Sequence, residues 1–178
     1  MSMSKIMGCA SATNVRQVND AYDTPSVVVE ALVRVEARYC PRVIWEPCSG
    51  NGGLAAVLRE HGAKVIEQDL DRGHDFLKAK AAKATAIVTN PPYKFATEFI
   101  LHAAKLGVGY HAWLLKADFL NAQRAIKLIS AIGYPTRIWA LTERPDFLCQ
   151  GAPTMNCSWF VWCGPGNFAA LKLLSVVN

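Results

Sequence analysis

The sequence predicts an α/β fold: a doubly wound, mostly parallel sheet that ends in an antiparallel hairpin at its C-terminal edge. Short apolar runs of strand length alternate with longer amphipathic segments of helix length along most of the chain. Three of the helical segments end at a glycine, namely Gly62, Gly107 and Gly133. This alternation is typical of right-handed βαβ units, in which helices cover both faces of a parallel sheet.

The first expected element is a helix over residues 26–38, with Thr24 and Pro25 before it as a helix-start signal. Its apolar residues recur at helical spacing and are Val28, Val29, Leu32, Val33 and Val35. Strands are then expected over residues 43–45, 64–69, 86–89 and 111–115, and helices over residues 53–61, 96–106 and 122–132. Two final strands, over residues 137–141 and 158–163, have no clear helix between them, which favours a hairpin.

The composition is that of a folded domain. The chain has 178 residues, of which 52% are hydrophobic and 19% are charged, so it can bury a full core and is not disordered throughout. No apolar run approaches the roughly 20 residues of a membrane-spanning helix, so no membrane partner is expected. The first 14 residues lack the apolar stretch of a secretory signal.

The cysteines and histidines indicate no metal site. None of the six cysteines belongs to a C-x-x-C pair or to a Cys/His metal pattern, and the four histidines share no ligand spacing. We therefore expect reduced, mostly buried thiols in a cytoplasmic protein.

The charge balance is compatible with a polyanionic partner. Nineteen Lys and Arg residues stand against 14 Asp and Glu residues, a formal net charge of +5. Residues 73–116 carry six lysines but only two acidic residues, Asp75 and Glu98. A solvated lysine face is the alternative interpretation.

Four chemically distinctive segments are expected at one edge of the sheet. In a sheet of this kind, ligands bind outside the carboxyl ends of the strands, near the switch in strand order. The segments expected there are residues 46–53, Asp69, residues 75–77 and residues 90–93.

Residues 46–53, Glu-Pro-Cys-Ser-Gly-Asn-Gly-Gly, link a strand to a helix. Gly50 and Gly52 let the backbone turn sharply and approach a ligand without a Cβ in the way. The segment is neither a G-x-G-x-x-G fingerprint nor a P-loop. Glu46, at the strand end, supplies a carboxylate that could face a cationic group. A tight connection without a ligand is the alternative.

Asp69 lies about 20 residues beyond the glycine turn, where nucleoside-binding α/β folds place an acid on ribose hydroxyls. Glu67 would point to the same face but deeper in the strand, and Asp71 lies past the strand end, so both are weaker candidates. Asp75 could accept from an exocyclic amine while Phe76 covers a purine ring. The alternatives are a cap or surface role for Asp69 and a core role for Phe76.

Residues 90–93, Asn-Pro-Pro-Tyr, form the most specific pattern in the chain. The two prolines fix φ and remove two N–H donors, which leaves the Pro91 carbonyl free to accept a hydrogen bond. The Asn90 amide oxygen is a second acceptor, and two acceptors on one planar amine would orient it. Tyr93 can stack on the ring that carries this amine.

Taken in order, these motifs resemble those of S-adenosylmethionine-dependent amino-methyltransferases, and most closely those of small phage-type adenine-N6 DNA methyltransferases. The resemblance runs from Tyr22 to about Cys163. Residues 22–25 resemble the motif that contacts the cofactor carboxylate, and residues 90–93 match the [DNS]-P-P-[YFW] catalytic motif. Residues 144–147 and 159–162 resemble the tail of the phage-type members.

The resemblance implies a Rossmann-like class I methyltransferase fold, S-adenosylmethionine as cofactor and nucleic acid, DNA first, as partner. It implies catalytic roles for Asn90, Pro91, Pro92 and Tyr93. It implies cofactor contacts from Tyr22, Thr24, Pro25, Glu46, Cys48, Gly50, Gly52, Asp69, Asp75, Phe76 and Asn90. It implies substrate contacts from Tyr93, Lys94 and Lys116.

We expect a flexible segment over residues 1–19 and a single methyltransferase domain over residues 20–178, without a separate target-recognition domain. A homodimer or a partner protein could then supply target recognition. Asn-Pro-Pro-Tyr also serves enzymes that methylate RNA bases or protein glutamine, so these substrates and small molecules stay open. A non-catalytic module that binds S-adenosylmethionine or nucleic acid is the alternative from another class.

Overall fold

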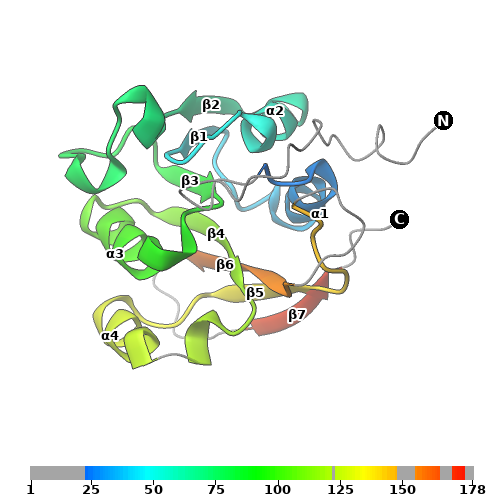
Figure 1. Cartoon of the computed structure of the whole chain (residues 1–178), viewed down its shortest axis with the longest axis vertical. Coiled ribbons are helices and arrows are strands. Elements are labelled where there is room, and N and C mark those ends of the chain that lie inside the picture. Colours follow the sequence, from blue (N-terminus) through cyan, green and yellow to red (C-terminus); the bar gives the residue numbers. More distant parts are fainter. Residues whose placement is uncertain (1–22, 122, 148–154, 165–169, 175–178) are drawn as a thin grey trace.

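The computed structural model describes residues 23–121, 123–147, 155–164 and 170–174, so Tyr22 and the N-terminal segment expected to be flexible lie outside the described residues. The strands are β1 (Val43–Glu46), β2 (Lys64–Glu67), β3 (Ala86–Thr89), β4 (Tyr110–Lys116), β5 (Arg137–Leu141), β6 (Cys157–Cys163) and β7 (Ala170–Leu174). They form one sheet in the order β2-β1-β3-β4-β6-β5-β7 (Figure 1). The first four of these pair in parallel, which confirms the doubly wound, mostly parallel architecture.

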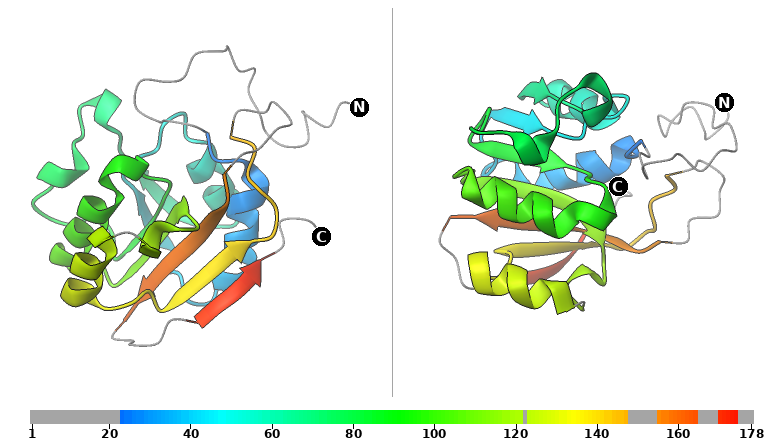
Figure 2. Two further views of the ribbon diagram at one scale, coloured as in Figure 1. Left: turned by 60° about the horizontal axis from the view of Figure 1, so that its bottom comes forward. Right: turned by 60° about the vertical axis from the view of Figure 1, so that its left-hand side comes forward.

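Helices cover both faces of the sheet (Figure 2). They are α1 (Ser26–Glu36), α2 (Gly53–Glu60), α3 (Ala96–Lys105) and α4 (Gln123–Ile132). The apolar sides of α1 and α2 pack on one face and those of α3 and α4 on the other. Ile44 and Trp45, neighbours in β1, are buried in opposite faces, as the alternation of strand side chains requires. Within the described residues, no helix has the length and apolar character needed to cross a membrane.

The C-terminal part of the sheet contains the expected antiparallel pair and one additional strand. β6 runs antiparallel to both β4 and β5. β7 pairs in parallel with β5 and takes the edge, so the hairpin lies one strand further in than the sequence predicted. The β7 sequence, Ala-Leu-Lys-Leu-Leu, consists of good helix formers without a β-branched residue, so its propensity did not indicate a strand.

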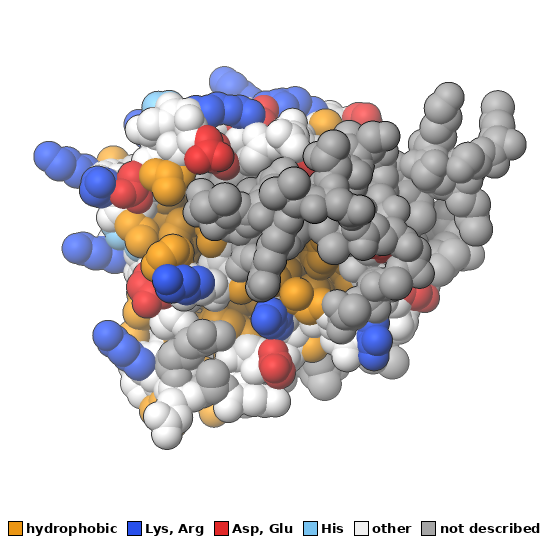
Figure 3. Space-filling model, viewed as in Figure 1, with side chains coloured by type: hydrophobic (Ala, Val, Ile, Leu, Met, Phe, Trp, Pro, Cys, Tyr) orange, Lys and Arg blue, Asp and Glu red, His pale blue; other side chains and the backbone are white. Residues whose placement is uncertain are grey.

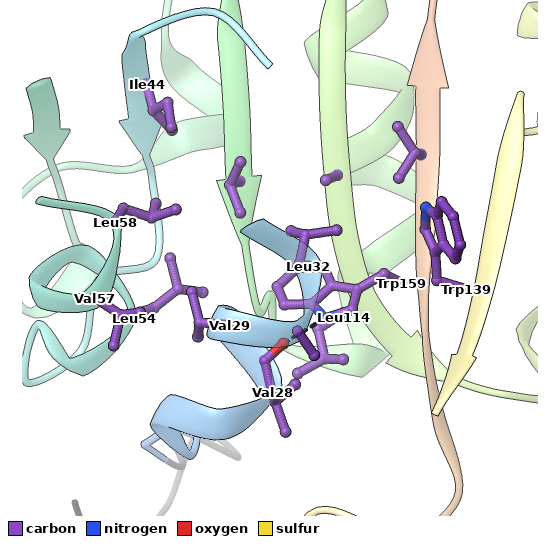
Figure 4. Packing of buried hydrophobic residues seen from close by; sticks show 14 of the residues in the cluster. Val28, Val29, Leu32, Ile44, Leu54, Val57, Leu58, Leu114, Trp139 and Trp159 are labelled. Carbon is purple, nitrogen blue, oxygen red and sulfur yellow. Dashed lines mark hydrogen bonds between the residues drawn. The ribbon is translucent and has the colours of Figure 1, made fainter. Parts of the chain in front are cut away.

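Two buried contacts fasten α1 to the last strands. Trp159 of β6 is fully buried and donates from Nε1 to the Val28 carbonyl of α1, 3.1 Å away (Figure 4). At the other end of α1, the buried Glu36 carboxylate pairs with Arg137 of β5, with Nε–Oε1 and Nη2–Oε2 distances of 2.6 and 2.8 Å. Trp139 and Tyr110 donate to the same carboxylate. These bonds hold α1, and with it the segment that precedes it, against the sheet.

Candidate active site

A cavity of about 960 Å³ lies at the carboxyl ends of β1, β2 and β3. The structure therefore brings together the four segments that the sequence placed at this edge. It also brings to them the segment before α1, for which the resemblance implied a cofactor contact. Of the predicted site residues, the cavity wall includes Thr24, Cys48, Gly50, Asp69, Asp75, Phe76, Asn90, Pro92 and Lys94. The wall does not include Pro25, Glu46, Gly52, Pro91, Tyr93 and Lys116.

The glycine loop after β1 is fastened to the segment after β2. The Gly50 N–H donates to Asp69 Oδ2 at 2.8 Å, and Arg72 Nη2 donates to the Gly50 carbonyl, also at 2.8 Å. Asp69 follows the end of β2 by two residues and caps a short 3-10 turn by accepting from the Asp71 N–H. Both backbone groups of Gly50 are thus held by the tip of the neighbouring strand.

Glu46 lies beneath the cavity rather than on its wall. Its side chain is fully buried at the end of β1 and accepts a hydrogen bond from the Thr89 hydroxyl of β3. Burial raises the pKa of this carboxyl well above its usual range, and the Thr89 hydrogen bond only partly opposes the rise. Glu46 Oε2 and the hydroxyl of Ser49, a wall residue, have no hydrogen-bond partner among the described residues.

Asp75 and Phe76 form another part of the wall. Asp75 Oδ1 accepts from the Leu77 N–H at 3.0 Å, and Oδ2 lies 3.1 Å from the Lys78 ammonium. Phe76 is buried, and its ring centroid lies 5.0 Å from those of Trp45 and Phe99. Phe76 therefore belongs to the core, which was one of the two alternatives, and it also lines the cavity.

The Asn-Pro-Pro-Tyr segment crosses from this cavity toward the end of β4. Asn90 lies on the wall, and its Nδ2 donates to Thr24 Oγ1 at 3.2 Å. Tyr93 points to the end of β4 and the start of β6, where its hydroxyl lies 3.7 Å from Cys157 Sγ. Lys116, the last residue of β4, places its ammonium 5.8 Å from the Tyr93 ring centroid. The segment thus joins the cavity to a second surface formed around Tyr93 and Lys116.

The sequence did not single out three residues whose side chains form hydrogen bonds near the ends of these strands. Arg72 holds the Gly50 carbonyl, and Asn51 Nδ2 donates to Asp23 Oδ2 at 3.1 Å, which ties the glycine loop to the segment before α1. Arg144 donates from Nε to Asn156 Oδ1, beside the end of β4. Asn51 lies in the glycine loop and Arg144 in residues 144–147, but the sequence predicted no role for either side chain, and Arg72 belongs to no motif. The only signal was a polar side chain within a few residues of a strand end.

The described residues contain no cluster of His, Cys, Asp or Glu that could hold a metal ion. The polar groups of the cavity wall are instead carboxylates, hydroxyls, the side-chain amides of Asn51 and Asn90, and basic side chains, which suit an organic ligand with several donors and acceptors.

Solved structures of other proteins share the fold of this chain. A candidate class I S-adenosylmethionine-dependent methyltransferase from Listeria monocytogenes matches with a TM-score of 0.63 at 15% identity, over 93% of this chain and 69% of its own. A candidate RNA methyltransferase from Pyrococcus horikoshii also gives 0.63, at 14% identity, over 88% of this chain and 93% of its own. The chain has a Rossmann-like methyltransferase fold.

A third solved structure shares the fold as part of a larger protein. The methyltransferase subunit of a type I restriction-modification system from Streptococcus thermophilus matches over 96% of this chain but 49% of its own, with a TM-score of 0.55 at 10% identity. No family model and no curated protein matches the sequence. At these identities the similarity establishes the fold, so the activity has to be argued from the site.

Proposed function

We propose that the chain transfers a methyl group from S-adenosylmethionine to an exocyclic amine, with adenine N6 in DNA as the leading acceptor. The observation that carries this proposal is the position of Asn90, whose amide lies on the wall of the cavity that the glycine loop also lines. Its Nδ2 is engaged by Thr24, so Oδ1 is left as an acceptor. When bound, the cofactor would supply an activated methyl group on its sulfonium sulfur.

The residues of the cavity fit this cofactor. Ser49 Oγ, a buried oxygen of the wall, has no partner among the described residues and could accept from an ammonium group. The carboxylates of Asp69 and Asp75 could accept from ribose hydroxyls and from an adenine amine. Phe76 offers an apolar surface to a purine ring.

The contribution of the chain to the reaction would be positioning. Asn90 Oδ1 and the Pro91 carbonyl would accept the two N–H groups of the target amine, which turns its lone pair toward the methyl group. Positioning of this kind is worth effective molarities of about 10⁵–10⁸ M. No nucleophilic side chain is needed, and burial raises the pKa of Cys48, which keeps the thiol on the cavity wall protonated.

The surface around Tyr93 supports a nucleic acid as the acceptor. A base flipped out of a duplex could stack on the Tyr93 ring, a contact worth roughly 1–3 kcal/mol. Lys116 beside this ring and Lys94 on the cavity wall could bind the flanking phosphates. Among the similar structures, one is a methyltransferase subunit of a restriction-modification system and another is a candidate RNA methyltransferase.

Some competing hypotheses name another methyl acceptor, and one assumes that the chain binds the cofactor without transferring a methyl group. RNA bases, protein glutamine and small amines would use the same acceptor pair. A non-catalytic binding module would not need that pair, so methyl transfer itself separates it from the enzymes. Calorimetric titration with the cofactor, followed by tritiated methyl transfer to DNA, RNA and cellular protein, distinguishes these hypotheses.

The decisive variant is Asn90→Ala. We expect methyl transfer to fall by at least about 100-fold, because the target amine loses an acceptor that positions it, while the dissociation constant of the cofactor changes little. The control is Asn121→Ala, an exposed amide outside the cavity wall. An Asn90→Ala variant that methylates DNA at the wild-type rate contradicts the assignment.

A further inference from the structure

The segment before α1 contacts both loops of the cavity. Asp23 accepts from Asn51 of the glycine loop, and Thr24 accepts from Asn90 of the Asn-Pro-Pro-Tyr loop. The Thr24 carbonyl lies 3.9 Å from the position that a Cβ on Gly53 would take. Because α1 is anchored to β5 and β6, this short segment is held between the loop assigned to the cofactor and the loop assigned to the target.

The hydrogen bond from Asn90 to Thr24 engages one end of the Asn90 amide and leaves the other end for the target. A side-chain amide has one acceptor end and one donor end, and only the oxygen can accept from an amine. With Nδ2 donating to Thr24, the oxygen is presented. A reversed amide would place its NH₂ group against the NH₂ group of the target, donor against donor.

The Thr24 hydroxyl still has a proton to donate. A hydroxyl carries one donor and two acceptor sites, and the bond from Asn90 uses one acceptor site. Thr24 is only 8% exposed, and the space it borders is the cavity. A ligand oxygen in the cavity could therefore accept this proton.

We propose that Thr24 is a positioning residue that fixes the orientation of the Asn90 amide and transmits occupancy of the cofactor cavity to it. A ligand that accepts the Thr24 proton polarises the hydroxyl oxygen, which strengthens the bond from Asn90 Nδ2. Binding of the cofactor then locks the amide with Oδ1 toward the target. This inference rests on the proposed function, since it assumes that Asn90 binds the amine.

The test compares Thr24→Val, which removes the hydroxyl at nearly constant volume, with Thr24→Ser, which keeps it. The matched control is Thr97→Val, because Thr97 is buried to a similar degree and its hydroxyl has no hydrogen-bond partner among the described residues. Two quantities are measured: kcat at saturating cofactor, and the NMR signals of the Asn90 side-chain amide as S-adenosylhomocysteine is added.

We expect Thr24→Val to lower kcat by about 10- to 100-fold, as loss of reactant orientation does. The shift of its Asn90 amide signals on addition of the ligand should be smaller than in the wild type, although the ligand still binds by calorimetry. Thr24→Ser should recover both properties, and Thr97→Val should match the wild type. A Thr24→Val variant with wild-type kcat, or with the wild-type shift of the Asn90 signals, overturns the inference.

Failure of the proposed function would look different. A wild-type chain that binds the ligand but methylates neither DNA, RNA nor protein contradicts the proposed function. In that case the NMR titration alone decides whether Thr24 couples the cavity to Asn90.

Discussion

Two separate features disfavour a side chain at Gly52: its left-handed backbone conformation and the nearby Glu67 carboxylate. Its φ is +86°, and a Cβ would lie 3.0 Å from Glu67 Oε2. The Glu67 carboxylate is paired with Arg59, so it would have to shift by a few tenths of an ångström together with that partner. A side chain at Gly52 would therefore press against the Glu67 carboxylate and strain the packing of the glycine loop on the tip of β2.

The first prediction compares Gly52→Ala with Gly62→Ala. Gly62 has nearly the same φ, +84°, but open space where its Cβ would lie. Both variants should lose about 1–2 kcal/mol of unfolding free energy from backbone strain. Only Gly52→Ala should also weaken cofactor binding, by about 10-fold or more, because it strains the packing of the loop. Urea unfolding and calorimetry measure the two effects, and equal cofactor affinities would refute the role given to the Glu67 contact.

At the scale of elements, the fold depends on how α1 is attached to the C-terminal strands. Glu36 and Arg137 are 101 positions apart in sequence, yet they form a buried, doubly hydrogen-bonded ion pair. Trp139 and Tyr110 complete the set of donors around the carboxylate. This pair fixes one end of α1, while the site segment lies at the other end.

We expect Glu36→Ala to lower the unfolding free energy by about 3–5 kcal/mol, because it leaves a largely buried guanidinium without its partner. The control Glu30→Ala, at an exposed position of the same helix, should stay within about 0.5 kcal/mol of the wild type. Urea unfolding followed by circular dichroism measures both. If the two variants are equally stable, the ion pair does not anchor α1.

At the scale of the whole molecule, part of the exposed positive charge lies at the end of the sheet where the target would bind. Lys and Arg side chains project along the left-hand side of the view in Figure 3, over the segment after β2 and over α3 and α4. Lys116 and Arg144 are exposed at the carboxyl end of β4, the end of the sheet at which the cavity lies. This arrangement predicts that electrostatic contacts with phosphates contribute to binding.

Lys116→Ala and Arg144→Ala should each weaken DNA binding and reduce the slope of log K against log salt by about one. Lys64→Ala is the matched control, since Lys64 is an exposed residue at the amino end of β2, the opposite end of the sheet. Fluorescence anisotropy over a range of salt concentrations measures the slope. A loss for Lys64→Ala as large as that for Lys116→Ala would show that only net charge matters.

Much of this architecture could be predicted from the sequence. The alternation of strand and helix signals predicted six of the seven described strands and the four helices, because most of them have either an apolar run or a helical period. β7 lacked such a signal, since its residues favour a helix and only its pairing with β5 makes it a strand.

The candidate site was predicted where side chains follow strand ends and missed where contacts depend on tertiary structure. Asp69 and Asn90 were identified because the carboxyl ends of parallel strands meet at one edge. The position of Glu46 beneath the cavity depends on the hydroxyl of Thr89 in the neighbouring strand. Arg72 gains its role only because a 3-10 turn brings it back to Gly50.

The two bonds to Gly50 have a consequence for the thermodynamics of ligand capture. Both its amide and its carbonyl are engaged by groups of the chain itself, Asp69 and Arg72. The entropy lost in shaping this turn is therefore lost during folding, and an arriving molecule encounters a rigid receptor. We therefore expect the ligand to bind at this turn with little change in the conformation of the loop.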